Sequence, residues 1–295
     1  RNRIVTTPNH RSHGGADVTS GGSGASNLTL RIASAAVLAP IVLAITYVGG
    51  WPFLVLCALG AVGIFWEWAR LTGTARAGDL APGLAALLAA LAFTGLHHPG
   101  AGTVSLAIGA GLAAVTAGGA TPGARLWAAV GVVYAGIAFI SPAVLRQDPL
   151  WGLTALWFLF ATVWTTDIFA FLGGRAIGGP LLWPQVSPKK TWVGAIAGLA
   201  GGVAAGVVVA YASGIGRLGM AGIMALLLSV LAQAGDLFES AVKRRFGAKD
   251  ASRLIPGHGG LMDRLDGFLV AAFAALLIGI VRQGTAAPGA GLLLW

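Results

Sequence analysis

Long apolar stretches joined by short polar connections fill the chain from residue 29 onward. A membrane-crossing α-helix needs about 20 predominantly apolar residues, and most of these stretches approach that length, whereas barrel strands show a weak alternation over about ten residues. The pattern therefore predicts an all-α polytopic integral membrane protein with about nine transmembrane helices. The predicted spans are 29–49, 51–68, 80–96, 101–119, 126–145, 150–173, 192–213, 218–238 and 264–283.

The first 28 residues are polar, rich in Gly, Ser, Thr and Asn, and without apolar periodicity. Such a composition is typical of a disordered tail, and the stretch lacks the hydrophobic segment of a signal peptide. The expected organisation is a disordered tail at 1–28, N-terminal transmembrane helices at 29–149 and a second transmembrane region at 150–295.

Composition supports a membrane protein. The chain is 56% hydrophobic and 10% charged, whereas soluble domains carry about 25% charged residues. Its one cysteine, Cys57, excludes an intramolecular disulfide and a cysteine metal cluster.

The charge distribution predicts an orientation. The formal charge of +9 comes from cations scattered between the spans, so we expect a lipid bilayer with anionic lipid as partner, and no nucleic acid. With a cytoplasmic N-terminus, only Arg146, Arg217 and Arg282 of the 19 Lys and Arg residues lie outside. The C-terminus is then outside, and the charged loops 174–191 and 239–263 face the cytoplasm.

The densest run of charge, residues 240–266, reads SAVKRRFGAKDASRLIPGHGGLMDRLD. At its start Asp236, Glu239, Ser240 and Lys243 follow the spacing i, i+3, i+4 and i+7, which places them on one helix face. Ionisable residues within a membrane are candidates for function because their burial is costly. The alternative is a solvated, interfacial helix end; for Glu239 both interpretations stay open.

Asp263 and Asp266 lie one helical turn apart at the start of the last predicted span, with Arg264 between them. Two carboxylates on one helical turn repel each other unless a cation neutralises them. Carboxylate oxygens bind Mg²⁺ when phosphate oxygens complete its coordination. A helix N-terminus also tolerates acids without a metal, which is the alternative.

A glycine-rich segment precedes these acids. Gly259 and Gly260 offer backbone N–H groups that could cradle an anion, although turns use the same residues. His258 beside them is either a catalytic or a structural histidine.

A second polar cluster begins at Asp167, near the cytoplasmic end of its span, and continues in residues 187–192, which read SPKKTW. Ser187 resembles an N-cap and Pro188 a first helical residue, which places Lys189 and Lys190 in the first turn. Cations at a helix N-terminus are unfavourable unless an anion is bound, so the pattern indicates phosphate binding.

Glu67 lies at a similar depth in the second span between Trp66 and Trp68. We interpret it as a residue of the interfacial belt.

The 240–266 run resembles the motif of the phosphatidate cytidylyltransferases, also called CDP-diacylglycerol synthases. The resemblance covers about residues 160–270, including Asp167 and the SPKKTW run, and departs from the family at Val193, where a Glu is usual. The first 150 residues share only hydropathy with it. The matching positions are Ser240, Val242, Lys243, Arg244, Lys249, Asp250, Ser252, Ile255, Pro256, His258, Gly259, Gly260, Leu261, Asp263, Arg264, Leu265 and Asp266.

The resemblance implies transfer of CMP from CTP to phosphatidate, giving CDP-diacylglycerol and pyrophosphate. It also implies Mg²⁺ with a possible second cation, a homodimer, and a multi-pass protein of the inner (plasma) membrane whose catalytic region is 150–295. The expected metal ligands are Asp236, Asp263 and Asp266. The expected catalytic residues are Asp236, Asp263, Lys243, Arg264 and His258. The expected residues for the CTP and phosphatidate phosphates are Lys189, Lys190, Ser187, Arg244, Lys249, Ser240, Gly259, Gly260 and Asp167.

Two other functions stay open. A CTP-dependent lipid-alcohol kinase could use the same metal and triphosphate groups with a hydroxyl acceptor. A secondary transporter would place its acids near the midplane, whereas here the charges gather at one membrane face.

Overall fold

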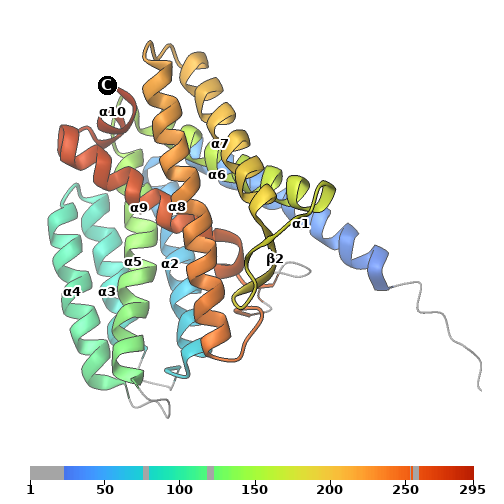
Figure 1. Ribbon diagram of the computed structural model, residues 1–295. Helices are drawn as coiled ribbons and strands as arrows, with labels where there is room; N and C mark the ends of the chain where they lie inside the picture. Colours follow the sequence, from blue (N-terminus) through green and yellow to red (C-terminus); the bar gives the residue numbers. More distant parts are fainter. Residues whose placement is uncertain (1–22, 76–79, 118–122, 253, 255–258) are drawn as a thin grey trace, which may run out of the picture.

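The computed structural model describes residues 23–75, 80–117, 123–252, 254 and 259–295, with the backbone alone over 23–35. These residues form ten helices and one two-stranded antiparallel sheet (Figure 1). The tail predicted at 1–28 lies outside the described residues up to 22, and α1 begins at Ser23. The elements are α1 (Ser23–Val48), α2 (Gly50–Thr72), α3 (Ala81–Gly95), α4 (Pro99–Thr116), α5 (Ala124–Arg146), α6 (Gly152–Ala176), β1 (Leu181–Trp183), β2 (Ser187–Thr191), α7 (Trp192–Ala212), α8 (Leu218–Arg245), α9 (Met262–Gln283) and α10 (Pro288–Leu293).

All nine predicted spans are helical, which confirms a mainly α-helical polytopic architecture. Within the described part of the chain, seven helices are long and apolar enough to cross a membrane, while α3 and the apolar part of α1 (Ala36–Val48) are shorter. Among these seven, α5 has the largest buried share and forms the centre of the core. The short helix α10 was not predicted.

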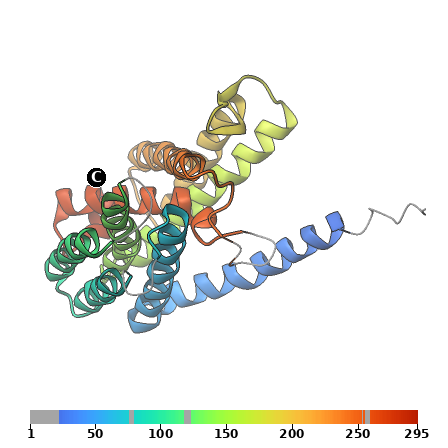
Figure 2. The same cartoon turned by 90° about the horizontal axis from the view of Figure 1, so that it is seen from below.

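The helices form two groups that α8 and α9 join. Helices α2 to α5 pack together on one side, α6 and α7 form an antiparallel pair on the other, and α1 extends away from the body (Figures 1 and 2). Glycines bring α7 very close to α6, since a Cβ atom at Gly198 would lie 2.8 Å from the Thr166 carbonyl oxygen. Small residues allow this approach within a membrane. Thr166 also shares a 2.7 Å hydrogen bond with Ser229 of α8, so the α6–α7 pair is fixed against α8.

Separate contacts stabilise the two ends of the helix bundle. Where α2 and α8 end and α5 begins, Trp68 donates a hydrogen bond to the Trp127 carbonyl (2.9 Å), and Arg245 lies over the Trp127 ring. These helix ends are at the bottom of Figure 1. At the opposite end, Arg146 donates to the Thr46 carbonyl (2.8 Å), and Asp148 accepts the Ala290 N–H (2.9 Å). The C-termini of α2 and α8 and the N-terminus of α5 therefore meet at one end, and the C-terminus of the chain lies at the other.

The segment from 181 to 191 departs from the predicted all-α fold. It forms a hairpin in which Leu181 pairs with Thr191 and Trp183 with Ser187. The prediction that Ser187 caps α7 is wrong, because the Thr191 hydroxyl accepts the Gly194 N–H (3.0 Å) and α7 begins at Trp192. Pro188 fits the strand because a two-stranded sheet leaves each strand one unpaired edge.

Candidate active site

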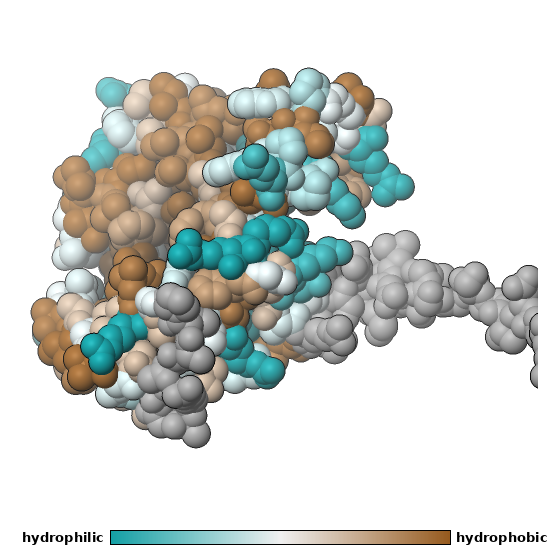
Figure 3. All heavy atoms as spheres, turned by 60° about the horizontal axis from the view of Figure 1, so that its bottom comes forward, coloured by the Kyte–Doolittle hydropathy of each residue, from teal (hydrophilic) through white to brown (hydrophobic). Residues whose placement is uncertain are grey.

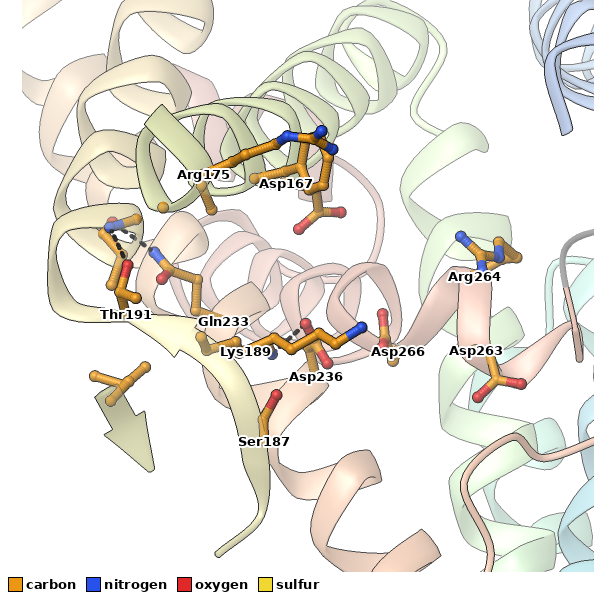
Figure 4. Close-up of a pocket in the computed structure, with 17 residues that line it drawn as sticks. Asp167, Arg175, Ser187, Lys189, Thr191, Gln233, Asp236, Asp263, Arg264 and Asp266 are labelled. Carbon is orange, nitrogen blue, oxygen red and sulfur yellow. Dashed lines mark hydrogen bonds and ion pairs between the residues drawn. The ribbon is translucent and has the colours of Figure 1, made fainter. Parts of the chain in front are cut away.

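A pocket of about 690 Å³ lies where α6, β2, α7, α8 and α9 meet (Figure 4). Hydrophilic side chains gather at the end of the molecule that Figure 3 shows, amid largely hydrophobic surroundings. The charged residues that line the pocket are Asp167, Arg175, Lys189, Lys190, Asp236, Asp263, Arg264 and Asp266.

Lys243 joins the two helices behind this pocket. Helix α8 continues to Arg245, so Asp236, Glu239 and Lys243 share one face as predicted. The Lys243 Nζ lies 3.1 Å from Glu239 Oε2 and 2.6 Å from Asp263 Oδ1 on α9, and the residue is 8% exposed. Removal of one partner from such a buried ion pair leaves an uncompensated charge, which is strongly destabilising.

Three carboxylates form the most compact acidic group among the described residues. Asp236, Glu239 and Asp266 each offer an oxygen within 4.8 Å of the other two. The interfacial interpretation of Glu239 is wrong, because its side chain is fully buried and its Oε1 has no hydrogen-bond partner. A buried, unpaired carboxylate oxygen beside two more carboxylates fits a hard cation such as Mg²⁺.

Asp263 is held differently from these three acids. Its Oδ2 accepts the N–H groups of Ala251 and Gly260, both at 2.9 Å, while its Oδ1 faces Lys243. The geometry thus brings predicted ligands Asp236 and Asp266 together and places Asp263 beside them, bonded to protein groups.

The glycine segment differs from the predicted anion cradle at Gly260. Its N–H is already bonded to Asp263, so a carboxylate of the protein occupies the place expected for a phosphate. Gly259 has φ +84°, a conformation that favours glycine. His258 lies outside the described residues.

The opposite wall of the pocket supplies cations from β2. Lys190 forms an ion pair with Asp236 across the pocket, and Lys189 is exposed. These lysines belong to a strand rather than a first helical turn, so the argument from the helix N-terminus does not apply to them. Asp167 and Arg175 extend from α6 toward the same space (Figure 4).

Besides Gly259 and Gly260, three more predicted phosphate-binding residues lie away from the pocket lining. Arg244 donates to the Ala248 carbonyl (2.8 Å), Lys249 is exposed on the loop, and Ser240 lies 3.5 Å from Asp236 Oδ1. Ser187 does line the pocket, as predicted.

Sequence reasoning missed the role of Glu67. The interpretation as an interfacial belt residue is wrong, because Glu67 is 0% exposed. Its carboxylate accepts hydrogen bonds from Ser252 Oγ (2.5 Å), the Leu261 N–H (2.8 Å) and the Met262 N–H (2.7 Å). The available signal was an acid inside an apolar span, which is costly without partners.

Comparison with known proteins identifies the family of the chain. The family model described as "Cytidylyltransferase family" matches residues 29–281, which extends well beyond the motif region. A phosphatidate cytidylyltransferase of Brucella suis biovar 1 (strain 1330) is 42% identical over 268 residues, which cover 90% of this chain and 98% of the relative. Its counterpart in Brucella abortus biovar 1 (strain 9-941) is 43% identical over 259 residues, covering 87% and 94%. A protein of the same name from Bacillus subtilis (strain 168) is 38% identical over 142 residues, covering 46% and 51%. The chain therefore belongs to the cytidylyltransferase family.

Proposed function

We infer that this protein is an integral-membrane nucleotidyltransferase that transfers the CMP moiety of CTP to phosphatidate and releases pyrophosphate. The observation that carries this inference is a pocket whose lining places Asp236 and Asp266 together with cations from β2 and α9. The buried Glu239 offers a third carboxylate oxygen within 4.8 Å of both acids. Its volume of about 690 Å³ lies within the range of ordinary ligand pockets. The names of the relatives supply the lipid substrate.

The reaction requires charge neutralisation more than proton transfer. An ionised oxygen of the phosphatidate phosphate attacks the α-phosphorus of CTP and forms a new P–O bond. The bond from the α-phosphorus to the bridging oxygen breaks, and pyrophosphate leaves with the electron pair. Because the attacking oxygen is already ionised, no general base is needed, and catalysis consists of positioning two polyanions and stabilising their charge.

The cations of the pocket suit this task. Lys189 and Lys190 lie on the strand that borders the pocket, and Arg264 and Arg175 line it from α9 and α6. Lys190 forms an ion pair with Asp236. When a triphosphate binds, one of its phosphates would replace this carboxylate as the partner of Lys190.

The acidic group would hold the divalent cation. Asp236, Glu239 and Asp266 present carboxylate oxygens within reach of one ion, and the unpaired Oε1 of Glu239 is a ready ligand. Bound Mg²⁺ would neutralise phosphate charge that the lysines alone leave unbalanced. Three expectations stay predictions: Asp263 as a metal ligand, a second cation in the site, and a homodimer.

The orientation is also part of this proposal. Gln233 and Asp236, which line the pocket, lie in the half of α8 nearer its C-terminus, and the span order puts Arg146 and Arg282 at the opposite end of the bundle. The excess of Lys and Arg at the pocket end supports a cytoplasmic site in the inner membrane. Single cysteines at the positions of Ala248 and the exposed Ala286, in a Cys57→Ala background, test it with an impermeant maleimide on intact cells. We expect labelling only at position 286, and labelling at position 248 would contradict the orientation.

The activity is tested with purified protein in detergent, given CTP labelled in the cytosine ring. With phosphatidate as acceptor, we expect the label in a chloroform-soluble product. Diacylglycerol as acceptor should give no phosphorylated lipid. Phosphorylation of the alcohol, without cytosine in the lipid phase, would favour the kinase.

A further inference from the structure

A carboxylate from the N-terminal half of the chain bonds directly to the segment that begins α9. Glu67 on α2 is fully buried, and it accepts hydrogen bonds from three donors that all belong to residues 252–262. It does not line the pocket. Any effect on the reaction must therefore pass through the residues that it holds.

Glu67 and Asp263 together hold the loop between α8 and α9 at two places, residues 251–252 near its middle and residues 260–261 at its end. Ala251 and Ser252, near the middle of the loop, donate to Asp263 and Glu67 respectively. Gly260 and Leu261, at its end, donate to the same two carboxylates.

Gly260 lies between these carboxylates with no room for a side chain. A Cβ atom there would lie 2.9 Å from Glu67 Oε1 and 3.0 Å from Asp263 Oδ2. The backbone at this point is therefore held on both sides.

The contact of Glu67 also completes the start of α9. The N-terminal N–H groups of a helix lack partners within the helix, and Leu261, the N-cap residue, provides no side-chain cap. Glu67 accepts the N–H groups of Leu261 and Met262, so its charge lies at the positive end of the helix dipole. The beginning of α9 carries Asp263, Arg264 and Asp266, which all line the pocket.

We propose that Glu67 is a positioning residue for the transfer reaction: it sets the start of α9 and thereby the place of Asp263 and Asp266 relative to α8. The kinetic part of this inference depends on the proposed function. Its structural part, the restraint of the loop, does not.

Asp148 offers a matched control at the other end of the bundle. It is 3% exposed and also accepts three hydrogen bonds, in this case from the N–H groups of Leu150, Trp151 and Ala290. Glu67→Gln and Asp148→Asn therefore each remove the charge of a buried carboxylate that accepts three hydrogen bonds. In each variant an amide NH₂, which cannot accept, also faces one of the donors.

The kinetic test compares these two variants in purified, detergent-solubilised protein. We expect Glu67→Gln to lower kcat about ten- to a hundred-fold, as for loss of a charge-assisted hydrogen bond, and to raise the Mg²⁺ concentration needed for half-maximal rate. Asp148→Asn should lower the unfolding temperature without a comparable fall in kcat. Glu67→Asp, which keeps the charge, should recover part of the rate. Equal kcat losses in Glu67→Gln and Asp148→Asn would overturn the proposal.

A second readout needs no activity. Lys249 is exposed within the loop, so limited trypsin digestion reports how firmly the loop is held. Cleavage after Lys249 should be faster in Glu67→Gln than in wild type, and unchanged in Asp148→Asn. Unchanged cleavage in Glu67→Gln would overturn the restraint even if the enzyme is active. If wild type makes no CDP-lipid, the proposed function fails while this digestion still decides the role of Glu67.

Discussion

The two walls of the pocket hold their charges in different ways. Directly behind the α8–α9 wall, the side chain of Lys243 is 10% exposed and bonded to Glu239 and Asp263. On the β2 wall, the side chain of Lys190 is 29% exposed and forms an ion pair with Asp236, and Lys189 is more open still. Fixed, buried charges are preorganised for the developing charge of a transition state, whereas exposed lysines can follow an incoming ligand. We therefore assign the chemistry to the α8–α9 wall and the capture of the triphosphate to the β2 wall.

The largest expected effect is the loss of an acid from the first wall. Asp236→Asn and Asp263→Asn should each abolish CDP-lipid formation. The first removes a carboxylate from the acidic group. The second removes the charge that faces Lys243 and replaces by NH₂ one of the two oxygens that accept from Lys243, Ala251 and Gly260. Membrane insertion should be unchanged. Turnover of either variant is measured at saturating Mg²⁺, and a rate near that of wild type would remove that residue from the chemistry.

A smaller effect on activity, with a marked effect on stability, is expected for Lys243→Met. Breaking a buried ion pair by removal of one partner costs about 3–5 kcal/mol, so the unfolding temperature in detergent should fall clearly. Lys189→Met is the matched control on the other wall and should leave stability unchanged, since this lysine is exposed. Similar unfolding temperatures for the two variants would mean that the walls do not differ as described.

The smallest effects are expected on the β2 wall. Lys189→Ala and Lys190→Ala should each weaken the use of CTP about ten- to a hundred-fold, because each removes one charge-assisted contact worth about 1.5–3 kcal/mol. Steady-state kinetics with each substrate varied in turn will separate CTP from phosphatidate. A defect confined to phosphatidate would move these lysines to the lipid side of the pocket.

The sequence predicted the parts of this site that local spacing controls. Apolar length located the nine helices, and the spacing of Asp236, Glu239 and Lys243 correctly placed them on one face of α8. Asp263 and Asp266 were expected at the start of α9, where they lie. Helical periodicity is local, so these relations follow from the sequence alone.

The features that were missed depend on contacts between distant segments. Glu67 and Met262 are 195 residues apart, and no local pattern pairs an acid of α2 with the N–H groups of α9. The hairpin was hidden because Ser187 and Pro188 also fit a helix start, and only pairing with Leu181–Trp183 favours the strand. The prediction of an open anion cradle was wrong at Gly260 for the same reason. Sequence alone did not show that the Gly260 N–H would donate to Asp263.

The fate of the individual phosphates of CTP is the most direct test of the proposed transfer of CMP. Purified protein with phosphatidate and Mg²⁺ is given CTP labelled at either the α- or the γ-phosphorus, and lipid and aqueous phases are counted separately. We predict α-label in the lipid and γ-label in released pyrophosphate, in equal amounts. Transfer of γ-label to lipid, or no transfer of α-label, would contradict this mechanism.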